Sequence, residues 1–179
     1  MICGGLDVST KAMGWSFLMD GSLLEYGSAK LPGWKDPGLF DKIFYEVVEL
    51  VSGVAGRNPC VGKVVGMDQC GGVEAAFGPD SFLVLVERPF GRVNWDTTMK
   101  LMATATAALV GARHGGAEAE LTDNMQWKAA TVGGKNPSKE RIAEWARADS
   151  GSMGDADEHA CDAYCMAKAL WLERGGGIE

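Results

Sequence analysis

The sequence lacks any long apolar run. None of its 179 residues belongs to a stretch of about 18 or more consecutive apolar residues, so no transmembrane helix is expected. The N-terminus has no basic segment followed by an apolar one, and therefore nothing predicts a secretion signal. We expect a protein of the cytoplasm that has no membrane partner.

Cysteines are few, odd in number and widely spaced. The five are Cys3, Cys60, Cys70, Cys161 and Cys165, and no two of them have the Cys-x-x-Cys spacing. This argues against a disulfide framework and favours reduced thiols inside a cell. A zinc site formed by His159, Cys161 and Cys165 is disfavoured, because Cys161 is two residues from His159 and so lies on a different face of a helix.

Positive charge is also scarce. The 17 basic and 24 acidic residues give a net charge of −7, which argues against nonspecific binding of nucleic acid. The two signs are nevertheless separated along the chain, where a basic stretch (Lys128, Lys135, Lys139, Arg141, Arg147) precedes an acidic one (Asp149, Asp155, Asp157, Glu158, Asp162). Such separation fits either a metal site beside a phosphate-binding face or a solvated charged surface.

The length and the 46% hydrophobic content predict one domain over residues 1–179. Hydrophobic periodicity predicts strands at 2–8, 15–18, 22–31, 82–86 and 119–122, and helices at 39–52, 95–112, 124–131, 139–148 and 158–174. Asp20-Gly21 predicts a hairpin between the second and third strands, and Asp157 is the predicted N-cap of the last helix. The glycine-rich segment 53–80 fits no single element and is interpreted as a candidate insertion.

Two predicted strands end in an acidic residue. Asp7 lies at the end of the first strand, and Glu87 follows the apolar run 82–86, whose continuous apolarity is typical of a central strand buried on both faces. A buried carboxylate is costly unless a cation or hydrogen bonds compensate it. Asp7 alone fits a turn-capping role, but two acids at the carboxyl ends of two buried strands lie where ligands bind in open α/β sheets.

The last predicted helix carries two further candidates. His159 and Asp162 are three residues apart and therefore share one helix face. Taken alone, this pair fits a local hydrogen bond as well as a metal site. Together with Asp7 and Glu87 it gives the order strand-end Asp, strand-end Glu, and a helix with His three residues before Asp.

This order resembles the RNase H-like nuclease superfamily, and within it the RuvC-type Holliday junction resolvases. The similarity covers most of the chain and is weakest over 53–80. Six segments carry it. Three lie in the first part of the chain: residues 5–9 (Gly-Leu-Asp-Val-Ser), 86–90 with the Glu-x-x-Phe pattern, and the helix at 94–112. The others are the basic segments 126–133 and 138–140, and 162–163 with Ala167. The resemblance implies an α/β fold with a mixed five-stranded sheet and helices on both faces. The acidic, divergent sequence also suggests a phage-encoded member.

The resemblance assigns roles to named residues. Asp7, Glu87, His159 and Asp162 would coordinate two Mg²⁺ ions, for which Mn²⁺ would substitute. Asp155 or Asp157 is an alternative to His159 as a ligand, and His159 is alternatively a general base. Lys128 is placed with the catalytic residues, and the expected DNA-binding residues are Arg88, Phe90, Lys128, Lys135 and Lys139, with Phe90 pressing against unpaired bases.

The implied activity is that of a metal-dependent endonuclease. It would resolve four-way DNA junctions by paired nicks through a two-metal mechanism, as a homodimer with the 94–112 helix in its interface. It would work in a bacterial or phage-infected cytoplasm. Three alternatives stay open: a relaxed endonuclease for flaps and forks, a non-catalytic DNA-binding RNase H-like domain, and a fragment of an actin-like kinase or ATPase. The last is disfavoured because no later glycine-rich nucleotide loop is present.

Overall fold

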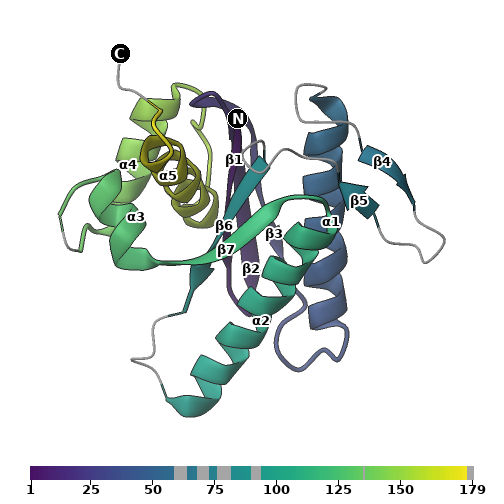
Figure 1. Cartoon of the computed structure of the whole chain (residues 1–179). Coiled ribbons are helices and arrows are strands. Elements are labelled where there is room, and N and C mark those ends of the chain that lie inside the picture. Colours follow the sequence, from purple (N-terminus) through teal and green to yellow (C-terminus); the bar gives the residue numbers. More distant parts are fainter. Residues whose placement is uncertain (59–63, 68–72, 76–81, 90–93, 135, 177–179) are drawn as a thin grey trace.

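A computed structural model describes residues 1–58, 64–67, 73–75, 82–89, 94–134 and 136–176 (Figure 1). The strands are β1 (Ile2–Val8), β2 (Ala12–Met19), β3 (Ser22–Lys30), β4 (Val64–Met67), β5 (Val73–Ala75), β6 (Phe82–Arg88) and β7 (Glu118–Asp123). The helices are α1 (Leu39–Arg57), α2 (Trp95–His114), α3 (Asn124–Ala130), α4 (Lys139–Ser150) and α5 (Glu158–Glu173). None of the described helices is long and apolar enough to span a membrane.

Five strands form one mixed sheet in the order β3-β2-β1-β6-β7. β2 is antiparallel to both of its neighbours, β1 and β3. β6 runs parallel to β1, and β7 runs parallel to β6. The predicted hairpin is confirmed, because Asp20 and Gly21 join β2 to β3 with φ values of 49° and 82°. Positive φ at both central residues is what a tight type I′ hairpin requires.

Helices cover both faces of the sheet (Figure 1). Alternation along the strands divides the core into two layers. Ile2, Leu6 and Val8 of β1 pack with α1 and α2, whereas Cys3 packs with α3, α4 and α5 on the opposite face. The α/β class, the mixed five-stranded sheet and the two helical layers are therefore confirmed.

Helix α1 is longer than predicted. It continues five residues beyond 52 to Arg57, although Gly53 and Gly56 are poor helix formers. Val54 and Ala55 are 1% and 5% exposed, so burial of these side chains outweighs the local cost of the glycines. β2 likewise begins at Ala12, three residues before the predicted start, since its pairing with β1 reaches Val8.

The segment after α1 contributes a separate small sheet. β4 and β5 pair antiparallel with each other and with no strand of the five-stranded sheet among the residues that the structure describes. Like the extension of α1 to Arg57, these two strands lie within 53–80 and were not predicted from hydrophobic periodicity. The interpretation of 53–80 as an insertion stays a prediction.

Candidate active site at the carboxyl ends of β1 and β6

Asp7 and Glu87 lie on neighbouring strands and on the same face of the sheet. β1 and β6 are parallel with Leu6 opposite Val86, so the next residue of each strand is one of the two acids. Leu6 and Val86 belong to the core layer with α1 and α2. Since side chains alternate, Asp7 and Glu87 face α5 on the other side.

Two glycines bring α5 close to this part of the sheet. A Cβ on Gly5 of β1 would lie 2.0 Å from the carbonyl oxygen of Ala163, and a Cβ on Gly14 of β2 would lie 2.2 Å from the carbonyl carbon of His159. Neither space admits a side chain. Gly14 is also the β2 residue paired with Asp7. The first turn of α5 therefore rests on the strand residues beside Asp7.

The close contact joins Asp7 to the last helix. Nδ1 of His159 lies 2.6 Å from Oδ2 of Asp7. This hydrogen bond, opposed by burial, raises the pKa of His159 above its ordinary value. With a proton on Nδ1 directed at the carboxylate, the neutral imidazole has its lone pair on Nε2.

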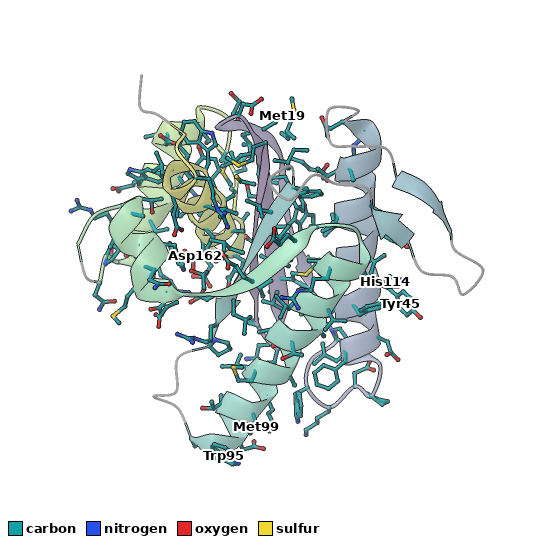
Figure 2. All side chains as sticks on the ribbon, in the orientation of Figure 1. Met19, Tyr45, Trp95, Met99, His114 and Asp162 are labelled. Carbon is teal, nitrogen blue, oxygen red and sulfur yellow. The ribbon has the colours of Figure 1, made fainter. Side chains whose placement is uncertain are left out.

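The remaining two carboxyls are also partly buried. Burial, followed by the charges of Asp7 and Asp162, raises the pKa of Glu87 to about 8. Burial, followed by the charge of Asp7, raises the pKa of Asp162 to about 7. Asp162 lies on α5 toward the strands (Figure 2). The three carboxyls interact electrostatically and are held together without enough positive charge to balance them.

Two of the predicted lysines act on this cluster. The charge of Lys128 on α3 opposes the rise in the pKa values of Glu87 and Asp162, and the charge of Lys139 on α4 opposes the rise in the pKa of Asp162. Burial and the neighbouring acids outweigh both lysines. Nζ of Lys139 lies 2.5 Å from Oε2 of Glu158, the first residue of α5. Nζ of Lys128 lies 5.0 Å from the centroid of the Trp127 ring. Both lysines thus act electrostatically on the acids while contacting other side chains.

Other predicted residues lie apart from the cluster or outside the described chain. Arg88 follows Glu87, faces the opposite side of β6 and forms an exposed ion pair with Asp123 at 3.1 Å. Asp155 is exposed. Phe90 and Lys135 lie outside the described residues, so their predicted contacts with DNA stay predictions.

Asp157 has a defined local role. It is the N-cap of α5, as predicted, and its Oδ1 accepts a hydrogen bond from the Ala160 amide at 3.0 Å. Its Oδ2 accepts a bond of 2.5 Å from the Ser28 hydroxyl. Burial acts to raise the pKa of Asp157, but these hydrogen bonds outweigh it and the pKa is lowered. The sequence indicated the cap, whereas Ser28 was missed because its contact spans 129 residues.

The donor set fits a hard divalent cation. Among the described residues no three His, Cys, Asp or Glu side chains already surround one point as ligands. Carboxylate oxygens are nevertheless the ligands that Mg²⁺ prefers, and a cation would compensate the repulsion between these acids. The side chains of Asp7 and His159 are 15% and 23% exposed, so an ion can reach them from solvent.

Comparison with known proteins supports the fold assignment. No family model and no curated protein matches the sequence. Among solved structures, RuvC from Thermus thermophilus superposes with a TM-score of 0.71 at 19% identity, over 98% of each chain. RuvC from T. thermophilus in complex with a Holliday junction substrate gives a TM-score of 0.70 at 22% identity, over 98% of this chain and 96% of the other. At these identities the likeness shows a RuvC-like fold.

Proposed function

We propose that this chain is a metal-dependent endonuclease that resolves four-way DNA junctions by paired nicks. The observation that carries the proposal is the meeting of Asp7, Glu87, His159 and Asp162 at one edge of a RuvC-like sheet. One of the similar structures was solved with a Holliday junction, which favours this substrate over a nucleotide or a carbohydrate. Fold likeness and site chemistry thus point to the same reaction class.

The metal-binding residues in this proposal are Asp7, Glu87, His159 and Asp162. Two Mg²⁺ ions bound there would activate a water and stabilise the charge on the attacking and leaving oxygens of the phosphodiester. Mn²⁺ would substitute, since it accepts the same oxygen and imidazole ligands. The raised pKa values of Glu87 and Asp162 belong to the metal-free protein, and ion binding favours their ionised forms.

The chain's own cations supply the contacts to DNA. Lys128 of α3 and Lys139 of α4 act electrostatically on the acidic cluster, and they would contact the phosphates flanking the scissile bond. Asp7 fixes the orientation of the His159 ring through Nδ1. Nε2 of His159 then carries the lone pair that would either bind a metal ion or accept the proton from the attacking water.

Paired nicks require two active sites, and α2 offers a surface for a second copy. Trp95 and Met99 are 78% and 50% exposed near its N-terminal end, and both lie far from the sheet (Figure 2). Exposed large apolar side chains gathered on one helix are typical of a protein interface. We therefore place the homodimer interface on α2.

The first experiment compares a synthetic four-way junction with a flap and a linear duplex. The wild-type protein and the Asp7→Asn variant are each incubated with Mg²⁺ and with EDTA, and Asp41→Asn serves as a control for an exposed carboxylate on α1, away from the site. Symmetric Mg²⁺-dependent nicks in the junction, lost in Asp7→Asn and kept in Asp41→Asn, support a resolvase. Equal cutting of flaps would instead indicate a general branched-DNA endonuclease. Junction binding without cutting in Mg²⁺ or Mn²⁺ would leave a DNA-binding domain.

A further inference from the structure

Three strand residues form a row across the sheet beneath the start of α5. Asp7 of β1 is paired with Gly14 of β2, and Gly14 is paired with Ser28 of β3. The row thus presents a carboxylate, a bare backbone and a hydroxyl in adjacent strands. Each of the three positions contacts a residue at the beginning of α5.

The contacts along this row occur in sequence order on the helix. Ser28 donates a hydrogen bond of 2.5 Å to Oδ2 of Asp157, and Gly14 lies against the backbone of His159. Asp7 bonds the imidazole of His159 at 2.6 Å. The start of α5 is therefore held on both sides of Gly14. On one side Asp157 contacts Ser28 of β3, and on the other His159 contacts Asp7 of β1.

We infer that the Ser28–Asp157 hydrogen bond is a positioning device that sets the placement of His159 and Asp162 against the sheet. Neither Ser28 nor Asp157 serves as a ligand in this inference. Asp157 connects the sheet to the helix, because one of its oxygens accepts from Ser28 of β3 and the other accepts from the Ala160 amide of α5. In the context of the proposed function, on which this inference rests for its consequence, the device determines how well His159 and Asp162 meet an ion held by Asp7.

The position of Ser28 makes a clean test feasible. Ser28 is exposed, so Ser28→Ala removes the hydrogen bond without opening a cavity. Ser28→Thr keeps the hydroxyl in a residue that favours strands. Asp157→Asn keeps an oxygen that accepts from the helix backbone and offers its amide N–H as a donor to the Ser28 hydroxyl, so both contacts are retained with the second reversed. Asp157→Ala loses both contacts.

A matched control comes from a helix on the other face of the sheet. Asn94 is the N-cap of α2 and accepts a hydrogen bond from the Thr97 amide at 2.9 Å. Asn94→Ala removes a helix cap and costs about 1 kcal/mol of stability, and α2 packs in the core layer opposite α5. This control separates a loss of placement at His159 from a general loss of helix stability.

The first readout is NMR of the imidazoles at one fixed pH in metal-free protein. The chain has two histidines, and His114 packs against Phe44 on the other face, so its signals serve as an internal reference. We expect Ser28→Ala to shift the His159 signals, Ser28→Thr to leave them near the wild-type positions, and Asn94→Ala to leave them unchanged. Unchanged His159 signals in Ser28→Ala would overturn the inference.

The second readout is calorimetric binding of Mn²⁺. We expect Ser28→Ala to weaken binding by about three- to tenfold, and Asp157→Ala by more, with wild-type affinity in Ser28→Thr and Asp157→Asn. Affinity within twofold of the wild type in Asp157→Ala would also overturn the inference. If the wild-type protein binds no Mn²⁺, the proposed function fails while the imidazole signals still decide the positioning role.

A second inference rests on a different feature, an open cavity of ≈ 800 Å³ between β7, α3 and the C-terminal half of α5. Its walls include Leu85, Leu121, Ala169 and Leu172. Trp127 also lines it and is 1% exposed.

The border of the cavity shows what kind of occupant fits. The cavity reaches three consecutive residues of β7, and β7 is the outermost strand of its sheet in the part of the chain that the structure describes. Arg113 of α2 donates hydrogen bonds to the Ala119 carbonyl, so the part of this edge that a partner strand could pair with lies beyond Ala119, beside the cavity. Its charged lining residues are Glu120 and Glu173. Acidic residues repel DNA phosphates and attract basic groups.

From these features we propose that the cavity binds an extended basic and apolar segment of a partner protein. The segment adds to the edge of β7 beyond Ala119, inserts an apolar side chain between Leu85 and Trp127, and places lysine or arginine beside Glu120 and Glu173. On α5 this surface uses the C-terminal half of the helix, whereas His159 and Asp162 lie in its N-terminal half.

The test uses a capped heptapeptide in which lysine alternates with leucine, followed by ¹H–¹⁵N NMR of the assigned protein. We expect saturable shifts of the Trp127 indole and the β7 amides, with binding weakened at least about tenfold in the Glu120→Lys, Glu173→Lys double variant. A peptide with glutamate in place of lysine should not bind. No saturable shift, equal binding of the acidic peptide, or full affinity in the double variant would each refute the proposal.

Discussion

Nδ1 of His159 lies 2.6 Å from Oδ2 of Asp7, although 152 residues separate them in the sequence. The contact joins the first strand of the domain to its last helix. It also shows that the candidate site is assembled from the two ends of the described chain, with Glu87 contributed from the middle. Predictions about this site therefore concern the whole fold.

Glu87→Gln should separate stability from catalysis. Glutamine keeps the shape of the side chain but removes a carboxyl whose pKa is about 8 because of burial and the nearby acids. We expect the melting temperature in EDTA not to fall at pH 8, because a repelling charge is lost. Junction cutting in Mg²⁺ should fall at least about 100-fold, since removing a group that stabilises transition-state charge typically has that effect. A cutting rate near the wild type would remove Glu87 from the proposed mechanism.

The metal-free protein should lose stability as the pH rises from 5 to about 8.5. Glu87 and Asp162 have pKa values of about 8 and about 7 in the folded state, and the pKa of His159 is also raised. All three groups therefore bind more protons when folded than when unfolded. Stability contributed by such groups is full below the unfolded-state pKa and disappears as the pH passes the folded-state pKa.

Urea unfolding in EDTA at several pH values measures this effect, which we expect to be on the order of a few kcal/mol. Mg²⁺ should offset it, because an ion that binds only the folded state adds stability according to its concentration and affinity. The stabilisation by Mg²⁺ should accordingly be larger at pH 8 than at pH 5. Stability that is constant or that rises over this range would contradict the burial of the acids.

Gly14→Ala should displace the start of α5. The added Cβ would lie 2.2 Å from the carbonyl carbon of His159, and the backbone there cannot simply rotate away. We expect a loss of about 1–3 kcal/mol in the free energy of unfolding together with weaker Mn²⁺ binding. Gly154→Ala is the matched control, since no atom lies within 4 Å of the Cβ position. Equal effects of the two substitutions would argue against a tight contact at Gly14.

Lys128→Ala and Lys139→Ala should each weaken junction binding in a salt-dependent manner. Both lysines act electrostatically on the acidic cluster, so both are expected to neutralise a DNA phosphate. The slope of the logarithm of the binding constant against the logarithm of salt concentration should decrease in magnitude by about one for each lysine. Fluorescence anisotropy measures this in Ca²⁺ or EDTA, with the exposed Lys30→Ala on β3 as a control that should retain the wild-type slope.

The sequence allowed the strand-end acids to be predicted because their signal is local. An acid directly after an apolar run identifies both Asp7 and Glu87, and spacing on one helix identifies His159 with Asp162. Strand register could not be predicted, and it is register that aligns Asp7, Gly14 and Ser28 across three strands. The role of Ser28 depends on this alignment and leaves no pattern in the neighbouring residues.

The end of α1 was missed for a related reason. Residues 53–57 contain two glycines, and local propensity predicts a helix end there. The burial of Val54 and Ala55 against the sheet decides otherwise, and such burial depends on tertiary packing. The resemblance to RuvC-type resolvases supplied the fold and the roles proposed for the site, whereas composition and periodicity alone supplied the elements.

The close seating of α5 on the sheet has a consequence for motion. Because Gly5 and Gly14 leave no room between strand and helix, α5 cannot tilt or slide without breaking the core packing of Ala163 and Ala167. Amide protons of α5 beyond its first turn should therefore exchange with solvent only when the domain unfolds globally. Asp162 is thus carried by a slow-exchanging segment, and its adjustment on ion binding must come from side-chain rotation, whereas His159 lies in the first turn.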